Sequence, residues 1–338
     1  MPSPQPSRQR VLSGIQPTGA GKHLGNYLGA VRHWAAMQDE NECFYFIADL
    51  HALNAQPEPA VLRESSRRTV AELLAMGVDP GRSTLFAQSH VVEHTELCWV
   101  LCCLTGQGEA SRMTQFKEKS ADRSGTGVNV GLFAYPILQA ADILLYQANA
   151  VPVGEDQRQH LELTRDLAQR FNNRYGETFT VPDPYLQKSA ERIKDLQDPT
   201  AKMSTSRGGP GVLWVIEDDK ATAKKVRSAV TDTGREVVYD MDDKPGISNL
   251  LTILSVVTGK AVPELEDAYT GKGYGDFKGD VADAVLTMFA PIRQRFAELM
   301  ADPAHLDRVL ADGSARAREV AAATMTVVRD RIGLLAPA

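Results

Sequence analysis

The sequence predicts an α/β protein: a doubly wound parallel sheet with a helical insertion, plus a smaller all-helical domain. Short segments rich in β-forming residues alternate with amphipathic helical segments over residues 10–88, which is typical of parallel βαβ units. A mostly helical stretch over residues 92–147 then precedes one more apolar strand. After about residue 217 helical periodicity dominates and strand signals are weak.

We expect strands over residues 10–15, 43–48, 84–88 and 151–153. We expect helices over 25–38 and 60–76, and a third that follows residue 157 and ends at about 172. The helix over 60–76 stops at Gly77, with Pro80 behind it. Ligands of a doubly wound sheet gather at the carboxyl ends of its strands. Gln16, Asp49 and His51 fall at such ends, so we expect them near a ligand.

These patterns divide the chain into four parts. Residues 1–9, with three prolines and two serines, are predicted to be a loose tail. The sheet domain spans residues 10–195, with its insertion at about 92–147. Residues 196–312 form a loop and a helical domain, with clear helices over 248–257 and 277–300. Residues 313–338 contain a last helix, over 314–332, that is expected to return to the sheet domain.

The composition is that of a globular protein. The chain has 338 residues, of which 43% are hydrophobic and 24% charged, so extensive disorder is not expected. Residues 1–9 do not have the apolar core expected of a signal peptide, and no apolar run reaches the ~18 residues of a membrane span. Four cysteines in a chain of this length suit a reducing compartment. We therefore expect a cytoplasmic protein without a membrane contact.

Two groups of residues leave alternatives open. Cys98, Cys102 and Cys103 could mark a metal site, but no CxxC pair or histidine at ligand spacing accompanies them, so buried thiols in an apolar helix are favoured.

The net charge of −6 does not indicate nucleic-acid binding. Local basic clusters could still bind phosphates, although solvated helix faces explain them equally simply: Arg112, Lys117, Lys119 and Arg123, and separately Lys220, Lys224, Lys225 and Arg227.

A glycine-rich turn follows the first expected strand. Residues 19–26 read GAGKHLGN and open a helix, whose unpaired N–H groups favour anions. Gly25 could lie beneath an adenine ring, while His23 and Asn26 can donate hydrogen bonds to phosphate oxygens. The turn is neither a Walker A loop nor a GxGxxG turn, and by itself it is as well explained by ordinary strand–helix structure.

A second polar loop carries a lysine and two serines. Residues 202–206 read KMSTS and lie between Pro199 and a Gly-Gly-Pro segment, which suits a mobile loop. Lys202 could follow the charge of a departing pyrophosphate. The alternative is a solvated surface loop without a ligand.

Asp142 stands in the otherwise apolar helical segment 140–146. A buried carboxylate needs a polar partner, which could be a ligand, a salt bridge or water at a helix end. The residues alone do not separate these alternatives. His51 taken alone is more often structural, although its position after a strand and beside Asp49 favours a site.

Residues 23–26 and 202–206 resemble the HIGH and KMSKS signatures of class I aminoacyl-tRNA synthetases, which have a Rossmann-like fold. Six longer blocks resemble the bacterial tryptophanyl-tRNA synthetases, and the similarity runs from about residue 11 to 334. The blocks are SGIQPTG at 13–19, MTQFKEKS at 113–120, AADILLY at 140–146, VPVGEDQ at 151–157, QHLELTRD at 159–166 and KPGISNL at 244–250.

The resemblance implies an ATP-dependent ligase that works in two steps. The tryptophan carboxylate attacks the α-phosphate of Mg²⁺-bound ATP, and tRNA(Trp) then accepts the tryptophanyl group from the adenylate. It also implies a homodimer joined through the insertion helices and a helical domain that contacts the anticodon. Mg²⁺ would be held by the ATP phosphates rather than by the protein.

The resemblance further implies the site residues. Gln16, Asn26, Lys202, Ser204 and Ser206 would be catalytic. ATP would be bound by residues from both signatures and the blocks between them: Gln16, Pro17, Thr18, Gly25, Asn26, Gly154, Glu155, Asp156, Ile193, Lys202, Met203, Ser204, Thr205 and Ser206. Tryptophan would be bound by Leu12, His51, Tyr135, Gln139, Asp142, Val151, Val153 and Gln157, with Asp142 accepting the indole N–H.

Three positions depart from the family pattern. Thr205 replaces a second lysine, Gln139 a methionine and Leu12 a phenylalanine. The turn over 19–26 is also one residue longer, which makes Lys22 a further candidate for a phosphate contact. Two rival interpretations remain: a tyrosyl-specific relative, and a paralogue that binds RNA or a partner without aminoacylation, which Thr205 favours.

Overall fold

The expected parallel sheet is present. The computed structural model describes residues 8–17, 19, 21–113, 129–154, 157–185, 193–205 and 208–335. Its five strands run in the order β3-β2-β1-β4-β5, and every neighbouring pair is parallel. They are β1 (Arg10–Ile15), β2 (Glu42–Ile47), β3 (Thr84–Ala87), β4 (Ala150–Pro152) and β5 (Asp183–Tyr185). The strand order reverses at β1, so the sheet opens to a ligand between β1 and β4.

Side chains of β1 to β4 alternate between two hydrophobic cores. In β2, Cys43, Tyr45 and Ile47 enter one core, while Phe44 and Phe46 enter the other. This two-residue period buries both faces, as parallel sheets require. Strand β5 was missed by sequence analysis because its three residues, Asp-Pro-Tyr, carry no apolar pattern and form a strand only by pairing with β4.

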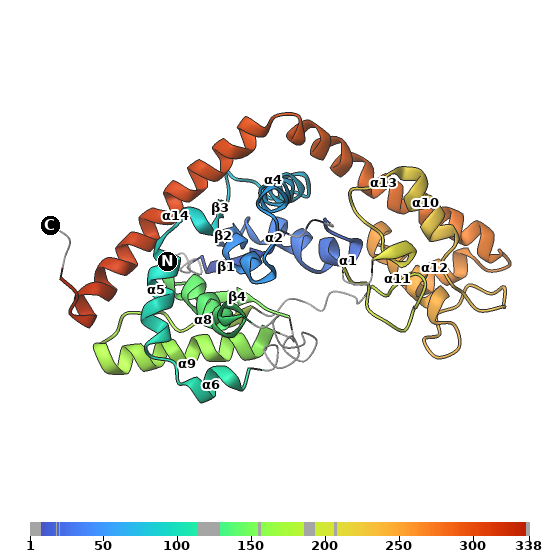
Figure 1. Ribbon diagram of the computed structural model, residues 1–338. Coiled ribbons are helices and arrows are strands. Elements are labelled where there is room, and N and C mark those ends of the chain that lie inside the picture. Colours follow the sequence, from blue (N-terminus) through green and yellow to red (C-terminus); the bar gives the residue numbers. More distant parts are fainter. Residues whose placement is uncertain are drawn as a thin grey trace, which may run out of the picture.

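Helices cover both faces of the sheet, as Figure 1 shows. One face is covered by α4 (Pro59–Ala75) and a continuous helical run made of α1 (Leu24–Asn26), the π-helical η1 (Tyr27–Val31) and α2 (Arg32–Met37). The other face is covered by α5 (Glu93–Cys102), α8 (Val130–Leu145) and α9 (Arg158–Tyr175). Shorter elements fill the connections: α3 (Asp49–Ala52), η2 (Leu53–Ala55), η3 (Gln88–His90), α6 (Gln107–Ser111) and η6 (Gly209–Gly211).

The C-terminal part contains helices only, as expected. These are α10 (Asp219–Arg227), α11 (Pro245–Thr258), α12 (Val262–Ala268), α13 (Tyr274–Met300) and α14 (Pro303–Ile332). The expected last helix, over 314–332, begins earlier, at Pro303, because Asp302 caps it and Pro303 occupies its first turn. Figure 1 shows α14 running back from the tip of α13 across the sheet. It packs against β3 and α5.

The close packing of α14 on β3 depends on Gly313. A Cβ atom at this position would lie 1.8 Å from the carbonyl oxygen of Leu85. We expect Gly313→Ala to lower the free energy of unfolding by about 1–3 kcal/mol, since the helix must move away from the strand. A thermal melt measures the change. Gly279→Ala in α13 is the matched control, because nothing lies within 4 Å of that position, and its melting temperature should be kept or raised.

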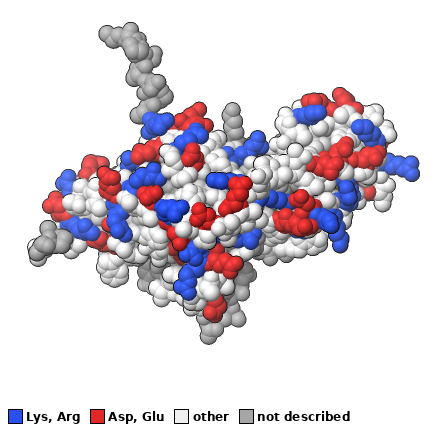
Figure 2. Space-filling model, turned by 90° about the horizontal axis from the view of Figure 1, so that it is seen from above, with Lys and Arg blue, Asp and Glu red and all other residues white. Residues whose placement is uncertain are grey.

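The remaining expectations about composition have mixed outcomes. Of the cysteines in α5 and at its end, Cys98 and Cys102 are half-buried and Cys103 is exposed, so the expectation of buried thiols was met only in part at Cys98 and Cys102 and was wrong for Cys103. Across the described ranges no single helix is long and apolar enough to cross a membrane; α11 and α12 pass such a test only as a pair bent by 108°. Figure 2 shows basic and acidic side chains interspersed over one face.

Candidate functional site

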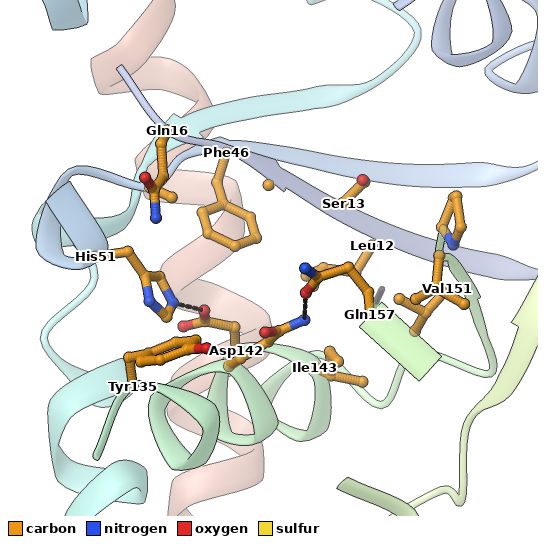
Figure 3. A pocket seen from close by; sticks show the side chains of 15 residues that line it. Leu12, Ser13, Gln16, Phe46, His51, Tyr135, Asp142, Ile143, Val151 and Gln157 are labelled. Carbon is orange, nitrogen blue, oxygen red and sulfur yellow. Dashed lines mark hydrogen bonds and ion pairs between the residues drawn. The ribbon is translucent and has the colours of Figure 1, made fainter. Parts of the chain in front are cut away.

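A cavity of about 270 Å³ lies at the carboxyl end of β1, where the strand order reverses. Figure 3 shows side chains from β1, β2, α3, α8 and β4 converging on it. All eight residues that the family resemblance assigned to tryptophan line this one cavity: Leu12, His51, Tyr135, Gln139, Asp142, Val151, Val153 and Gln157. Gln16, which was assigned to the nucleotide, lines it as well.

Asp142 is the buried charge of this cavity. Its side chain is 1% exposed and projects from α8. Oδ2 accepts a hydrogen bond from His51 Nε2 at 2.9 Å, while Oδ1 accepts from Gln88 Nε2 and from His94 Nδ1, both at 2.7 Å. Sequence analysis offered a salt bridge or a ligand as the partner of the Asp142 carboxylate. The structure is compatible with both, because two histidines and an amide hold the carboxylate and it also borders the cavity.

The environment keeps this carboxylate ionised. Burial by itself would raise the pKa of Asp142, but the hydrogen bonds from His51 and His94 and their positive potential outweigh it and lower the pKa to about 2. His94 is oriented in turn, because its Nε2 and the Tyr146 hydroxyl form a hydrogen bond of 2.8 Å. A carboxylate offers about four acceptor positions, and the described residues use three of them, which leaves one position near Oδ2 that none of them occupies.

A second polar chain crosses the mouth of the cavity. His160 Nδ1 donates to Gln157 Oε1 at 2.8 Å, and the Gln139 amide approaches the same oxygen at 3.4 Å. The Tyr135 hydroxyl lies 3.3 Å from His160 Nε2. Tyr135 and Gln157 are thus positioned by a common histidine at the start of α9, which the sequence analysis did not single out.

The apolar wall depends on a contact between neighbouring strands. Gly14 in β1 pairs with Phe46 in β2, and a Cβ atom on Gly14 would lie 2.3 Å from the Phe46 ring. Glycine therefore lets the ring lie over β1 and face the cavity (Figure 3). Sequence reasoning missed Phe46, Gln88 and His94. Gln88 follows β3, so the strand-end rule applied to Gln16 and His51 would have found it.

The glycine-rich turn leads into the helical run through a reciprocal cap. His23 Nδ1 accepts from the Asn26 backbone N–H, and the Asn26 side chain accepts from the His23 N–H, both at 3.3 Å. Burial, with the charges of Lys202 and Lys22, lowers the pKa of His23 to about 4, so its ring is neutral at pH 7. The turn is tied to the C-terminal part, since Leu24 N–H donates to the carbonyl of Leu213.

The lysine/serine loop lies near this turn. Lys202 forms an antiparallel bridge with Lys194, and Met203 N–H donates to the carbonyl of Ile193. The side chains of Met203 and Ile193 are buried in the core, whereas Lys202 is exposed and its charge acts on His23. Of the other residues assigned to ATP, the structure also describes Pro17, Gly154, Ser204 and Thr205. Four lie outside the described residues: Thr18, Glu155, Asp156 and Ser206.

Comparisons with known proteins agree with this geometry. A family model described as tRNA synthetases class I (W and Y) matches residues 5–290. A tryptophan–tRNA ligase 2 of Streptomyces avermitilis is 58% identical and covers 97% of this chain and 98% of the relative. A tryptophan–tRNA ligase of Corynebacterium glutamicum is 55% identical, covering 97% and 95%. A Campylobacter jejuni tryptophanyl-tRNA synthetase, solved with ADP and tryptophan, aligns with a TM-score of 0.85 at 35% identity, covering 96% and 100%.

Proposed function

The chain belongs to the class I tRNA synthetases of the tryptophan and tyrosine group, and from this premise we propose that it joins tryptophan to tRNA(Trp). The enzyme activates L-tryptophan with ATP, releases pyrophosphate and transfers the tryptophanyl group to the terminal ribose of the tRNA. We propose that the enzyme works in the cytoplasm, which suits a chain of 338 residues with only four cysteines.

The observation that carries the amino-acid assignment is the held carboxylate of Asp142 in a cavity that also has an apolar wall. Its remaining acceptor position suits the indole N–H, while Leu12, Val151 and Phe46 supply surface for the rings. Tyr135 and Gln157 border the same space and suit the amino group. A site built around this hydrogen bond rejects phenylalanine, because the buried acceptor would then be left without its partner.

The first chemical step needs no protein nucleophile. The tryptophan carboxylate attacks the α-phosphorus, and the bond to the departing pyrophosphate breaks. The protein positions both reactants and stabilises the charge that develops. Gln16 stands between the cavity and the nucleotide, Asn26 and Gly25 lie beneath the nucleotide, and Lys202 meets the pyrophosphate. Because the ring of His23 is neutral, Lys202 supplies the positive charge that stabilises the departing pyrophosphate.

Mg²⁺ fits this scheme as a partner of the nucleotide. Among the described residues no group of three or more His, Cys, Asp or Glu side chains could hold a metal ion. Mg²⁺ commonly binds through substrate phosphates and water, and we propose that it enters on ATP. It supplies charge neutralisation of the phosphates during the transfer.

We also propose a homodimer and an anticodon contact. Large apolar side chains are exposed around the helical insertion: Val92 is 62%, Trp99 71% and Val130 80% exposed. Such a patch favours a protein interface, and a second copy of this chain is the partner we propose. The helices after residue 196 would contact the anticodon arm of the tRNA.

The exchange of labelled pyrophosphate into ATP tests the proposed activity. We expect exchange with tryptophan, and kcat/KM for tyrosine and phenylalanine lower by at least about 10³-fold, since neither ring presents an indole N–H. Exchange driven by tyrosine alone would establish a tyrosyl-specific enzyme. No exchange with either amino acid, in enzyme that binds tRNA, would favour the non-aminoacylating paralogue.

A further inference from the structure

Lys22 is buried next to the proposed active site and has no role in the steps described above. Its side chain is 4% exposed, and among the lysines of the described ranges it alone is buried. Burial lowers the pKa of Lys22, and only the negative charge of Glu72 opposes this effect. Burying an ammonium costs more free energy than burying an apolar side chain of similar length, so we expect a specific contact that offsets this cost.

That contact is with the main chain at the end of β1. Lys22 Nζ donates to the carbonyl oxygen of Gln16 at 3.2 Å. The ammonium thereby ties the glycine-rich turn to Gln16, the residue that follows β1, six positions earlier in the chain. Because Gln16 also lines the amino-acid cavity, the position of its main chain sets where its side chain lies (Figure 3).

A buried acid on α4 supplies the negative charge that favours the ammonium of Lys22. Glu72 is fully buried, and its Oε1 accepts from Arg68 Nε at 2.9 Å. Its Oε2 has no hydrogen-bond partner within the described part of the chain. Burial raises the pKa of Glu72, and the charges of Lys22 and Arg68 counteract that rise. Glu72 therefore lowers the cost of burying Lys22, and the two cations lower the cost of burying Glu72, whereas Lys22 and Arg68 repel each other.

The same group contacts the C-terminal part of the chain. The carbonyl of Lys22 accepts from Val215 N–H at 2.9 Å, and the Arg68 guanidinium lies 5.5 Å from the centre of the Phe296 ring in α13. Gly21 keeps room for the group, because a Cβ atom there would lie 2.8 Å from Glu72 Oε1. Lys22 thus connects the end of β1, α4 and the segment before α10.

We propose that Lys22, whose buried ammonium is favoured by the charge of Glu72, is a positioning residue for adenylate formation. Its ammonium fixes the main chain of Gln16 at the boundary between the amino-acid cavity and the nucleotide. This role rests on the proposed function and replaces the expectation that Lys22 contacts phosphate, since its buried side chain donates from Nζ to a backbone carbonyl.

Lys22→Met tests the proposal, because methionine keeps the length and removes the charge and the donors. We expect kcat of tryptophan-dependent pyrophosphate exchange to fall by about tenfold to hundredfold, because a small misplacement of a positioning group has effects of this size. KM for ATP and the dissociation constant for tryptophan should stay within about threefold. Lys260→Met, at an exposed lysine, is the matched control.

The alternatives give different results. A direct phosphate contact would raise KM for ATP more than kcat falls, and a merely structural role would lower the melting temperature with kcat per folded enzyme unchanged; either result overturns the proposal. If Lys22→Met does not fold, Glu72→Gln decides, with a fall in kcat of about tenfold expected. Unchanged kcat there overturns the proposal too. Absence of exchange in the unsubstituted enzyme would instead refute the proposed function.

Discussion

Replacing Asp142 by Asn is expected to lower kcat/KM for tryptophan by about 10²–10³-fold while KM for ATP stays within about threefold. The carboxylate accepts three hydrogen bonds, from His51, Gln88 and His94. An Asn amide presents an NH₂ group where one of these donors now points, so one pair becomes donor against donor. The substitution also removes the negative charge toward which the indole N–H would donate.

The chemistry of the ligand separates recognition from mere structure. A tryptophan analogue in which sulfur replaces the indole N–H cannot donate to Asp142. We expect the unsubstituted enzyme to discriminate strongly against this analogue and Asp142→Asn to lose most of that discrimination. Tryptophan kinetics that do not change in the variant would remove Asp142 from the recognition site. His94→Gln is a useful second variant. It weakens a hydrogen bond to the Asp142 carboxylate but leaves the negative charge of that carboxylate in place.

Lys202→Ala is expected to slow adenylate formation by about 10²–10³-fold, with the dissociation constant for tryptophan nearly unchanged. The lysine is exposed, and its charge acts on the turn that carries His23. It would stabilise the negative charge that moves onto pyrophosphate as the bond breaks, so its loss affects the transition state more than the bound amino acid. Single-turnover measurement of adenylate formation, together with equilibrium binding of tryptophan, checks both parts.

Lys194→Ala provides the matched control for Lys202. The two lysines form the same antiparallel bridge, but Lys194 Nζ donates to the carbonyl of Thr200 and not toward the turn. We expect Lys194→Ala to leave the rate of adenylate formation close to that of the unsubstituted enzyme. An equal loss of tryptophan affinity and rate in Lys202→Ala would contradict the proposed role of its charge in the transition state.

The family assignment and the parallel sheet predicted from the sequence are both confirmed. Strands β1 and β2 and helices α4 and α13 were predicted to within a few residues, because their periodicity and end signals are local. The domain boundaries and the roles of the site residues stay predictions. The gathering of eight of those residues around one cavity is an observation that supports them.

The order of residues by itself determined the strands and helices whose apolar period is local, the strand ends that carry Gln16 and His51, and the motifs that indicate the family. The tertiary structure alone decided which groups meet: His94 and Gln88 at Asp142, Lys22 at the carbonyl of Gln16, and β5 beside β4. The reason is physical. In each of these contacts, the sequence around one group does not specify which distant group it will meet. The favourable free energy of the contact is gained only when folding brings both groups together.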